Sequence, residues 1–210
     1  MERKGILLVV SGFSGAGKGT LMKSLVESYD NYALSISMTT RKPREGEENG
    51  KAYFFVEESV FLEKIKEEKV IEYAQYCGNY YGTPKEYVEE MLHQGKDVIL
   101  EIEIQGALKV KEKYPDALLL FVMPPSAEEL KRRLVGRGTE TEEVISQRLL
   151  RASEEAEGIE AYDYILINDK LEDCVKELHN LVMAAHNTPD RNQEFINHIR
   201  KELKGLLKGE

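Results

Sequence analysis

The sequence predicts an α/β fold built on a doubly wound parallel sheet, with a small mixed α/β insertion and a helical hairpin added to it. Three observations predict this fold. Short apolar runs recur along the 210 residues, helical patterns lie between them, and a glycine-rich segment directly follows the first run. Continuous apolar runs are typical of parallel strands buried on both faces, and their alternation with helices favours a doubly wound arrangement.

Four predicted strands alternate with four predicted helices. The strands are Ile6–Val10, Val98–Ile102, Leu118–Val122 and Tyr164–Ile167. The helices are Lys18–Tyr29, Gly106–Lys113, Ala127–Val135 and Leu171–Ala185. We expect every strand to be buried on both faces, because each run is almost entirely apolar.

Three segments depart from this rhythm. Residues 35–95 hold several prolines and glycines and many tyrosines, which predicts a small mixed insertion. Residues 126–158 carry many Arg and Glu side chains and predict a mostly solvated helical hairpin. Residues 187–210 show apolar side chains at helical spacing, which predicts a helical extension beyond a domain of residues 1–186. Whether its apolar face docks on this chain or on a partner stays open.

Composition limits the class of protein. The chain is 41% hydrophobic and 32% charged, which is typical of a globular domain. Its net charge of −9 opposes non-specific binding to nucleic acid or an anionic membrane. The first apolar run is far shorter than the roughly 20 residues of a membrane span, and the two cysteines suggest neither a disulfide framework nor a metal site. We expect a cytoplasmic protein without nucleic-acid or membrane partners. The oligomeric state stays open.

A glycine-rich loop connects the first predicted strand to the first predicted helix. Residues 11–20 read SGFSGAGKGT, the pattern of a phosphate-binding loop, or P-loop. Glycines let successive backbone N–H groups surround a phosphate, and the helix N-terminus adds its positive end. Lys18 supplies a charge for the β- and γ-phosphates. The residues expected to bind ATP here are Gly12, Ser14, Gly15, Ala16, Gly17, Lys18, Gly19 and Thr20.

One departure from the strict P-loop pattern is informative. Gly19 stands where Ser or Thr usually follows the lysine, and Thr20 comes one residue later. Nucleoside monophosphate kinases often carry this Gly-Lys-Gly-Thr variant, which favours that class. The Thr20 hydroxyl can reach a phosphate or a metal ion. The alternative, an ordinary glycine-rich turn, does not account for the lysine and the flanking elements together.

Further segments resemble the guanylate kinase family. They are SMTTRKPREGE at 37–47, NGKAYFF at 49–55, IEYA at 71–74, GNYYGTP at 78–84 and LEIEIQG at 100–106. The resemblance runs from about Gly5 to Ala185. It implies a kinase that transfers the γ-phosphate of ATP directly to GMP, giving ADP and GDP, with Mg²⁺ bridging the β- and γ-phosphates. Activity on dGMP stays open.

The resemblance also implies a GMP site in residues 35–95. Arg41 and Arg44 would clamp the GMP phosphate, because guanidinium groups pair well with phosphate dianions. Glu72 would read guanine by accepting its N1–H and N2 amine, which adenine cannot satisfy. The other implied contacts are Ser37, Tyr53, Tyr81, Thr83, Glu101 and Glu103.

For some of these residues, the sequence pattern indicates a ligand site even without the resemblance. Glu101 and Glu103 alternate with isoleucines, so both would face one side of a strand end, where α/β sheets bind ligands. Taken alone, Glu72 reads as a surface carboxylate and the tyrosines as packing residues. Two departures from the family pattern are Phe13, where proline is usual, and Glu101-x-Glu103, where some members have Asp-x-Asp.

The hairpin resembles the family's lid over ATP. Arg137 and Arg148 match the arginines that would reach the transferred phosphoryl group, which makes Lys18, Arg41, Arg137 and Arg148 the expected catalytic residues. Asn168 would lie on the adenine side of ATP. Without the resemblance, most charges of this hairpin read as a salt-bridged, solvated surface.

Three rival functions remain in view. A kinase acting on AMP or UMP would share the P-loop, but Glu72 with Ser37 and Thr83 argues against it. A guanylate-kinase-like binding module without catalysis typically has a degraded P-loop, whereas Lys18 and Thr20 are present. A regulatory GTPase would need an Asn-Lys-x-Asp motif, and none is convincing in the sequence.

Overall fold

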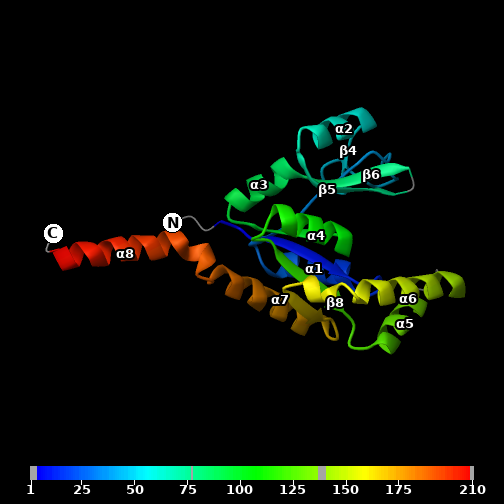
Figure 1. The fold of residues 1–210 in the computed structure, drawn as a ribbon. Helices are drawn as coiled ribbons and strands as arrows, with labels where there is room; N and C mark the ends of the chain where they lie inside the picture. Colours follow the sequence, from blue (N-terminus) through cyan, green and yellow to red (C-terminus); the bar gives the residue numbers. More distant parts are fainter. Residues whose placement is uncertain (1–3, 77, 137–140, 209–210) are drawn as a thin grey trace.

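The core of the molecule is a five-stranded parallel sheet, seen in a computed structural model that describes residues 4–76, 78–136 and 141–208 (Figure 1). The spatial order of the strands is β2-β7-β1-β8-β9. Their bounds are β1 Leu7–Gly12, β2 Tyr32–Leu34, β7 Asp97–Glu101, β8 Leu118–Met123 and β9 Tyr164–Ile167. The P-loop therefore follows the central strand, with β7 and β8 on its two sides.

Helices cover both faces of this sheet. Their bounds are α1 Lys18–Ser28, α3 Lys85–His93, α4 Ile104–Lys113 and α7 Leu171–His186. Leu8 and Val10 of β1 join the apolar cluster that contains α1 and α7. Leu7 and Val9 join the cluster that contains α3 and α4. Because successive side chains of β1 enter opposite layers, the predicted doubly wound α/β fold is confirmed.

The insertion forms a second, smaller layer above the core (Figure 1). Its four strands lie in the order β4-β3-β6-β5 and are covered by one helix. The bounds are β3 Met38–Thr39, β4 Phe54–Phe55, α2 Glu58–Lys66, β5 Val70–Tyr76 and β6 Asn79–Pro84. Met38, Phe61 and Val70 form its own small core. The hairpin β5–β6 also packs against the core domain, because α4 lies against β5.

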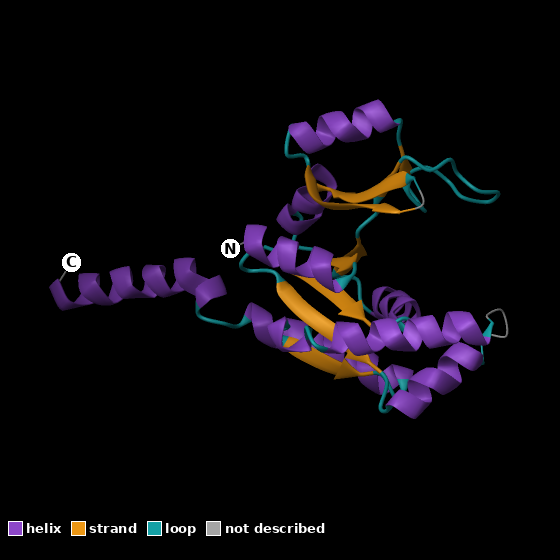
Figure 2. Cartoon of the chain, turned by 45° about the vertical axis from the view of Figure 1, so that its right-hand side comes forward, coloured by secondary structure: helices purple, strands orange, loops and turns teal. Residues whose placement is uncertain are grey.

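The helical hairpin lies beside the carboxyl ends of the core strands (Figure 2). It consists of α5 Ala127–Val135 and α6 Glu142–Ala156. The hydroxyl of Ser126 caps α5 by accepting a hydrogen bond from the Glu129 N–H at 3.1 Å. Ile145 and Ala152 are buried against the core, so α6 is less solvated than its charges predict.

Three sequence predictions differ from the structure. The strand β2 is missed, because a three-residue strand carries too little pattern. Tyr164–Ile167 is the edge strand β9, and Ile165 and Ile167 are 50% and 55% exposed, so its burial on both faces is wrong. Ile165 and Ile167 lie on one face of this strand, whereas Leu166 lies on the opposite face and is buried in the core. The strand β7 ends at Glu101, and Glu103 is instead the N-cap residue of α4.

The chain ends in a helix that projects from the domain (Figure 1). The 3₁₀ turn η2 Asp190–Asn192 leads into α8 Gln193–Lys208. Leu203, Leu206 and Leu207 of α8 are more than half exposed. Among the described elements, only η2, which directly precedes it, is in more than marginal contact with α8. None of the described helices has the length and apolar character needed to cross a membrane.

Candidate active site

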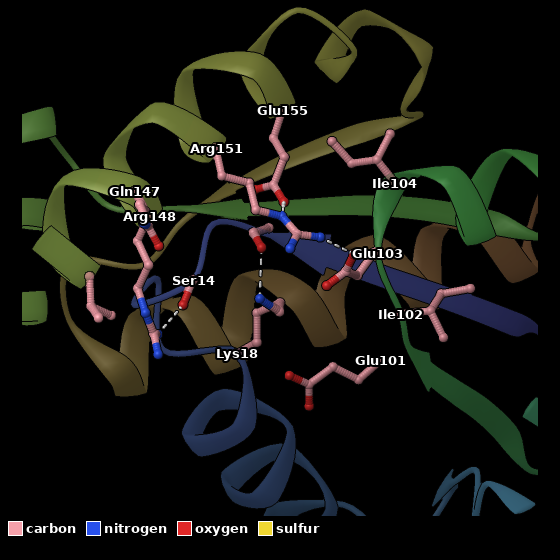
Figure 3. Close-up of a pocket in the computed structure, with 12 residues that line it drawn as sticks. Ser14, Lys18, Glu101, Ile102, Glu103, Ile104, Gln147, Arg148, Arg151 and Glu155 are labelled. Carbon is pink, nitrogen blue, oxygen red and sulfur yellow. Dashed lines mark hydrogen bonds and ion pairs between the residues drawn. The ribbon is translucent and has the colours of Figure 1, made fainter. Parts of the chain in front are cut away.

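A polar cavity of about 660 Å³ opens where the central strand β1 ends. Its walls come from the P-loop, the connection between β7 and α4, and the inner face of α6 (Figure 3). The lining residues are Gly12, Ser14, Lys18, Glu101, Ile102, Glu103, Ile104, Val144, Gln147, Arg148, Arg151 and Glu155. The site lies at the carboxyl ends of parallel strands, as expected for an open α/β sheet.

The P-loop and the first turn of α1 form one wall of this cavity. Lys18 Nζ donates hydrogen bonds to the carbonyl oxygens of Gly12 at 2.7 Å and Phe13 at 3.3 Å. Gly17 has φ of +90°, a backbone conformation that favours glycine. Thr20 and Gly19 are exposed in the first turn of α1, and Phe13 is buried against Phe121. Phe13 thus anchors the loop through aromatic packing.

The helix α6 touches the P-loop directly. Arg148 Nη1 donates to Ser14 Oγ at 2.6 Å (Figure 3). One guanidinium from α6 therefore lies beside the loop that would hold the phosphates of ATP. Arg137 falls outside the described residues.

The sequence analysis missed two charged residues of this cavity. Arg151 pairs with Glu103 across the cavity and with Glu155 on its own helix, the latter at 3.2 Å. Burial raises the pKa of Glu155, and Arg151 opposes this rise. A signal was available, because Arg148, Arg151 and Glu155 recur at intervals of three and four residues on one face of α6.

The outer side of the P-loop is held by Asn168 and Arg133. Asn168 Nδ2 donates to the Ala16 carbonyl at 2.8 Å, and Arg133 Nη1 donates to the same oxygen at 3.3 Å. Arg133 also donates to the Asn168 carbonyl at 2.8 Å and to Glu129 at 2.7 Å. Asn168, expected on the adenine side of ATP, therefore contacts the loop itself. No pattern in the sequence singled out Arg133 from its basic neighbours.

The insertion brings together a second set of predicted residues. Arg41 forms a bidentate pair with Glu47, with both N–O distances at 2.9 Å, and its guanidinium lies 5.4 Å from the Tyr53 ring centre. Tyr53 meets Tyr81 edge to face at 6.0 Å. The Glu47 carboxylate raises the pKa of Arg41, and Arg41 lowers that of Glu47. The Arg44 side chain is exposed, while its N–H donates to Glu47 at 2.7 Å.

Glu72 lies deeper, between the insertion and the core. Thr83, which is 1% exposed, donates its hydroxyl to Glu72 Oε1 at 2.7 Å. Burial raises the pKa of Glu72, and the Thr83 hydrogen bond opposes this rise. A carbon atom added at Gly106 would lie 3.6 Å from Glu72 Oε2, so the carboxylate borders the first turn of α4. Ser37 lies just before β3 and is half-buried.

Three of the predicted carboxylates border the start of α4. Glu101 and Glu103 lead into this helix from the cavity side, and Glu72 lies beside its first turn. Among the described residues, no three His, Cys, Asp or Glu side chains form a group that could hold a metal ion. The cavity beside the P-loop lysine is lined by the Ser14 hydroxyl and by the carboxylates of Glu101, Glu103 and Glu155, oxygen groups that suit Mg²⁺ only together with phosphates and water.

Comparison with known proteins gives the family. The family model described as guanylate kinase matches residues 4–185. The chain belongs to the guanylate kinase family. It is 48% identical over 203 residues to the guanylate kinase of Bacillus anthracis, covering 96% of this chain and 99% of that protein. The guanylate kinase of Lactococcus lactis is 48% identical over 204 residues, covering 97% and 100%.

Structural comparison agrees with this assignment. The crystal structure of guanylate kinase from Anaplasma phagocytophilum matches with a TM-score of 0.70 and 33% identity over 91% of each chain. The resemblance in the sequence motifs is therefore confirmed as membership of the guanylate kinase family over the core sheet, the insertion and the hairpin.

Proposed function

We propose that this chain is a guanylate kinase that transfers the γ-phosphate of ATP directly to GMP and releases ADP and GDP. The observation that carries the proposal is that the two candidate sites meet at the start of α4. Lys18 of the P-loop lines one cavity with Glu103 and Ile104, and Glu72 of the insertion, held by Thr83, borders the first turn of the same helix. Membership of the guanylate kinase family supports GMP as the acceptor.

At the ATP end, the P-loop N–H groups and Lys18 hold the β- and γ-phosphates. Arg148 contacts Ser14 from α6, which supports a role for its guanidinium beside the same phosphates. Phosphoryl transfer requires little covalent chemistry from the protein, so positioning and charge stabilisation dominate. No protein side chain acts as a nucleophile, because the GMP phosphate attacks directly. Arg137 is proposed as a further cation at the transferred phosphoryl group.

At the GMP end, Arg41 and Arg44 bind the phosphate and Glu72 reads the base. Tyr53 and Tyr81 lie beside Arg41, which supports phosphate contacts from their hydroxyl groups. Thr83 fixes the Glu72 carboxylate, and Ser37 precedes the strand beside it. Glu101 and Glu103 lie between the two ends and would contact the acceptor nucleotide. Activity on dGMP belongs to the same proposal as an alternative acceptor.

Mg²⁺ is proposed as the metal that accompanies ATP. Thr20 would contribute its hydroxyl, and the remaining ligands would be phosphate oxygens and water. When bound, the ion neutralises charge that develops between the β- and γ-phosphates.

The test is ADP release with ATP, Mg²⁺ and each of GMP, dGMP, AMP, UMP and CMP. Rapid turnover with GMP and slow turnover with AMP, UMP and CMP would support the proposal. A folded protein that binds ATP but turns over none of them would favour a binding module, and faster turnover of AMP or UMP would favour the rival kinases.

A further inference from the structure

We infer that Arg133 is a positioning residue for the P-loop: with Asn168 it fixes the Ala16–Gly17 peptide so that the Gly17 N–H points toward the phosphates of ATP. The inference rests on the proposed function and extends it to a residue outside the cavity. It is carried by the contacts on the outer side of the loop.

The Ala16 carbonyl is held from outside by two donors. Asn168 Nδ2 reaches it at 2.8 Å and Arg133 Nη1 at 3.3 Å. The described peptide bonds are all trans, and in a trans peptide the N–H points opposite to the C=O. Pulling the Ala16 carbonyl outward therefore directs the Gly17 N–H to the inner side of the loop.

The same two side chains also limit how this peptide can move. A Cβ at Gly17 would lie 2.6 Å from Asn168 Nδ2, so the carboxamide fills the space beside the Gly17 backbone. Asn168 is 6% exposed, and its backbone carbonyl accepts a hydrogen bond from Arg133 Nη2 at 2.8 Å. Rotation of the Ala16–Gly17 peptide would break these bonds inside the protein. The loop is thus preorganised for an anion. Donors stabilise developing charge most strongly when they need no rearrangement during the reaction.

Arg133 is itself held in place. Glu129, one turn earlier on α5, accepts from Arg133 Nε at 2.7 Å. The three guanidinium nitrogen atoms of Arg133 thus donate to Glu129, Ala16 and Asn168, an arrangement that a lysine cannot reproduce. Because α5 is the first helix of the lid hairpin, Arg133 also links the lid to the P-loop.

Arg132 provides a matched control. It binds the same Glu129 at 2.6 and 2.7 Å, but its side chain is 76% exposed and it makes no contact with the P-loop within the described residues. Arg132→Met and Arg133→Met remove the same charge from adjacent positions of one helix. Only the second removes the hydrogen bonds to Ala16 and Asn168.

The experiment compares these two variants in the full chain. For Arg133→Met we expect kcat with saturating GMP to fall about 10- to 100-fold, since misplacing one donor at a developing charge has effects of this order. Affinity for Mg²⁺–ADP, measured by calorimetry without GMP, should fall about tenfold, while GMP affinity without ATP changes less than about twofold. Arg132→Met should match the wild type in all three.

One further measurement and one further variant keep the inference testable. In ¹⁵N-labelled protein, the shift of the Gly17 amide on adding Mg²⁺–ADP should shrink in Arg133→Met and persist in Arg132→Met. If Arg133→Met does not fold, Arg133→Lys replaces it, with the same losses in smaller measure. Equal loss of ADP and GMP affinity, or a variant with wild-type ADP affinity, would overturn the inference. Turnover of GMP by the wild-type protein tests the proposed function separately.

Discussion

Replacing Glu72 by Gln should sharply reduce the preference for GMP over AMP. Thr83 occupies one lone pair of Oε1, which leaves the other oxygen and one further lone pair for guanine. In Glu72→Gln, an NH₂ group replaces one acceptor and faces a guanine N–H. The loss of one charge-assisted hydrogen bond is worth about 1.5–3 kcal/mol, and an unsatisfied buried donor adds about 1–3 kcal/mol.

Together these terms give at least about 2.5 kcal/mol, which corresponds to a fall of roughly sixtyfold or more in kcat/KM for GMP. The assay is ADP release at limiting GMP and at limiting AMP. Glu63→Gln is the control, because it removes the same charge from an exposed position of the insertion. If the ratio of kcat/KM for GMP to that for AMP changes by less than about fivefold in Glu72→Gln, Glu72 does not read the base.

Three further predictions follow from the same geometry. Lys18→Ala should lower kcat far more than it weakens GMP binding, and equal small changes in both would contradict its placement at the phosphates of ATP. Because burial raises the pKa of Glu72, KM for GMP should begin to rise on acidification at a higher pH than an exposed glutamate would give. KM for ATP should lack that rise, and in Glu72→Gln only the part caused by protonation of the GMP phosphate should remain. Removing residues 193–210 should shift Tm by less than about 4 °C and leave turnover intact, since α8 covers little of the described domain; a larger shift, or loss of turnover, would show that the helix docks on the domain.

The sequence predicted those parts of the fold whose signal is local and repeated. The four long strands, the α/β class and the P-loop all follow from apolar runs and from the spacing of glycines and a lysine. The edge position of β9 was not predictable, because Tyr164–Ile167 is as apolar as a central strand. Only the order of strands in space decides how many neighbours it has.

Site residues were predictable where chemistry is concentrated in one segment. Glu101 and Glu103 lie at one cavity as expected, although Glu103 reaches it from the N-terminus of α4 instead of from a strand. Arg151 and Arg133 could not be separated from other arginines of the hairpin. Their contacts, with Glu103 in one case and with Ala16 in the other, join positions 48 and 117 residues apart.

At the proposed GMP site, the Arg41 guanidinium already has a charged acceptor. Glu47 accepts two hydrogen bonds from it, both at 2.9 Å. The GMP phosphate would have to compete with this carboxylate for Arg41, and Arg44 and the tyrosine hydroxyl groups would have to shift that balance. A phosphate dianion is a stronger competitor than a monoanion, because hydrogen bonds to charged acceptors are stronger. The affinity for GMP should therefore depend strongly on full ionisation of its phosphate, even though the chain as a whole carries a charge of −9.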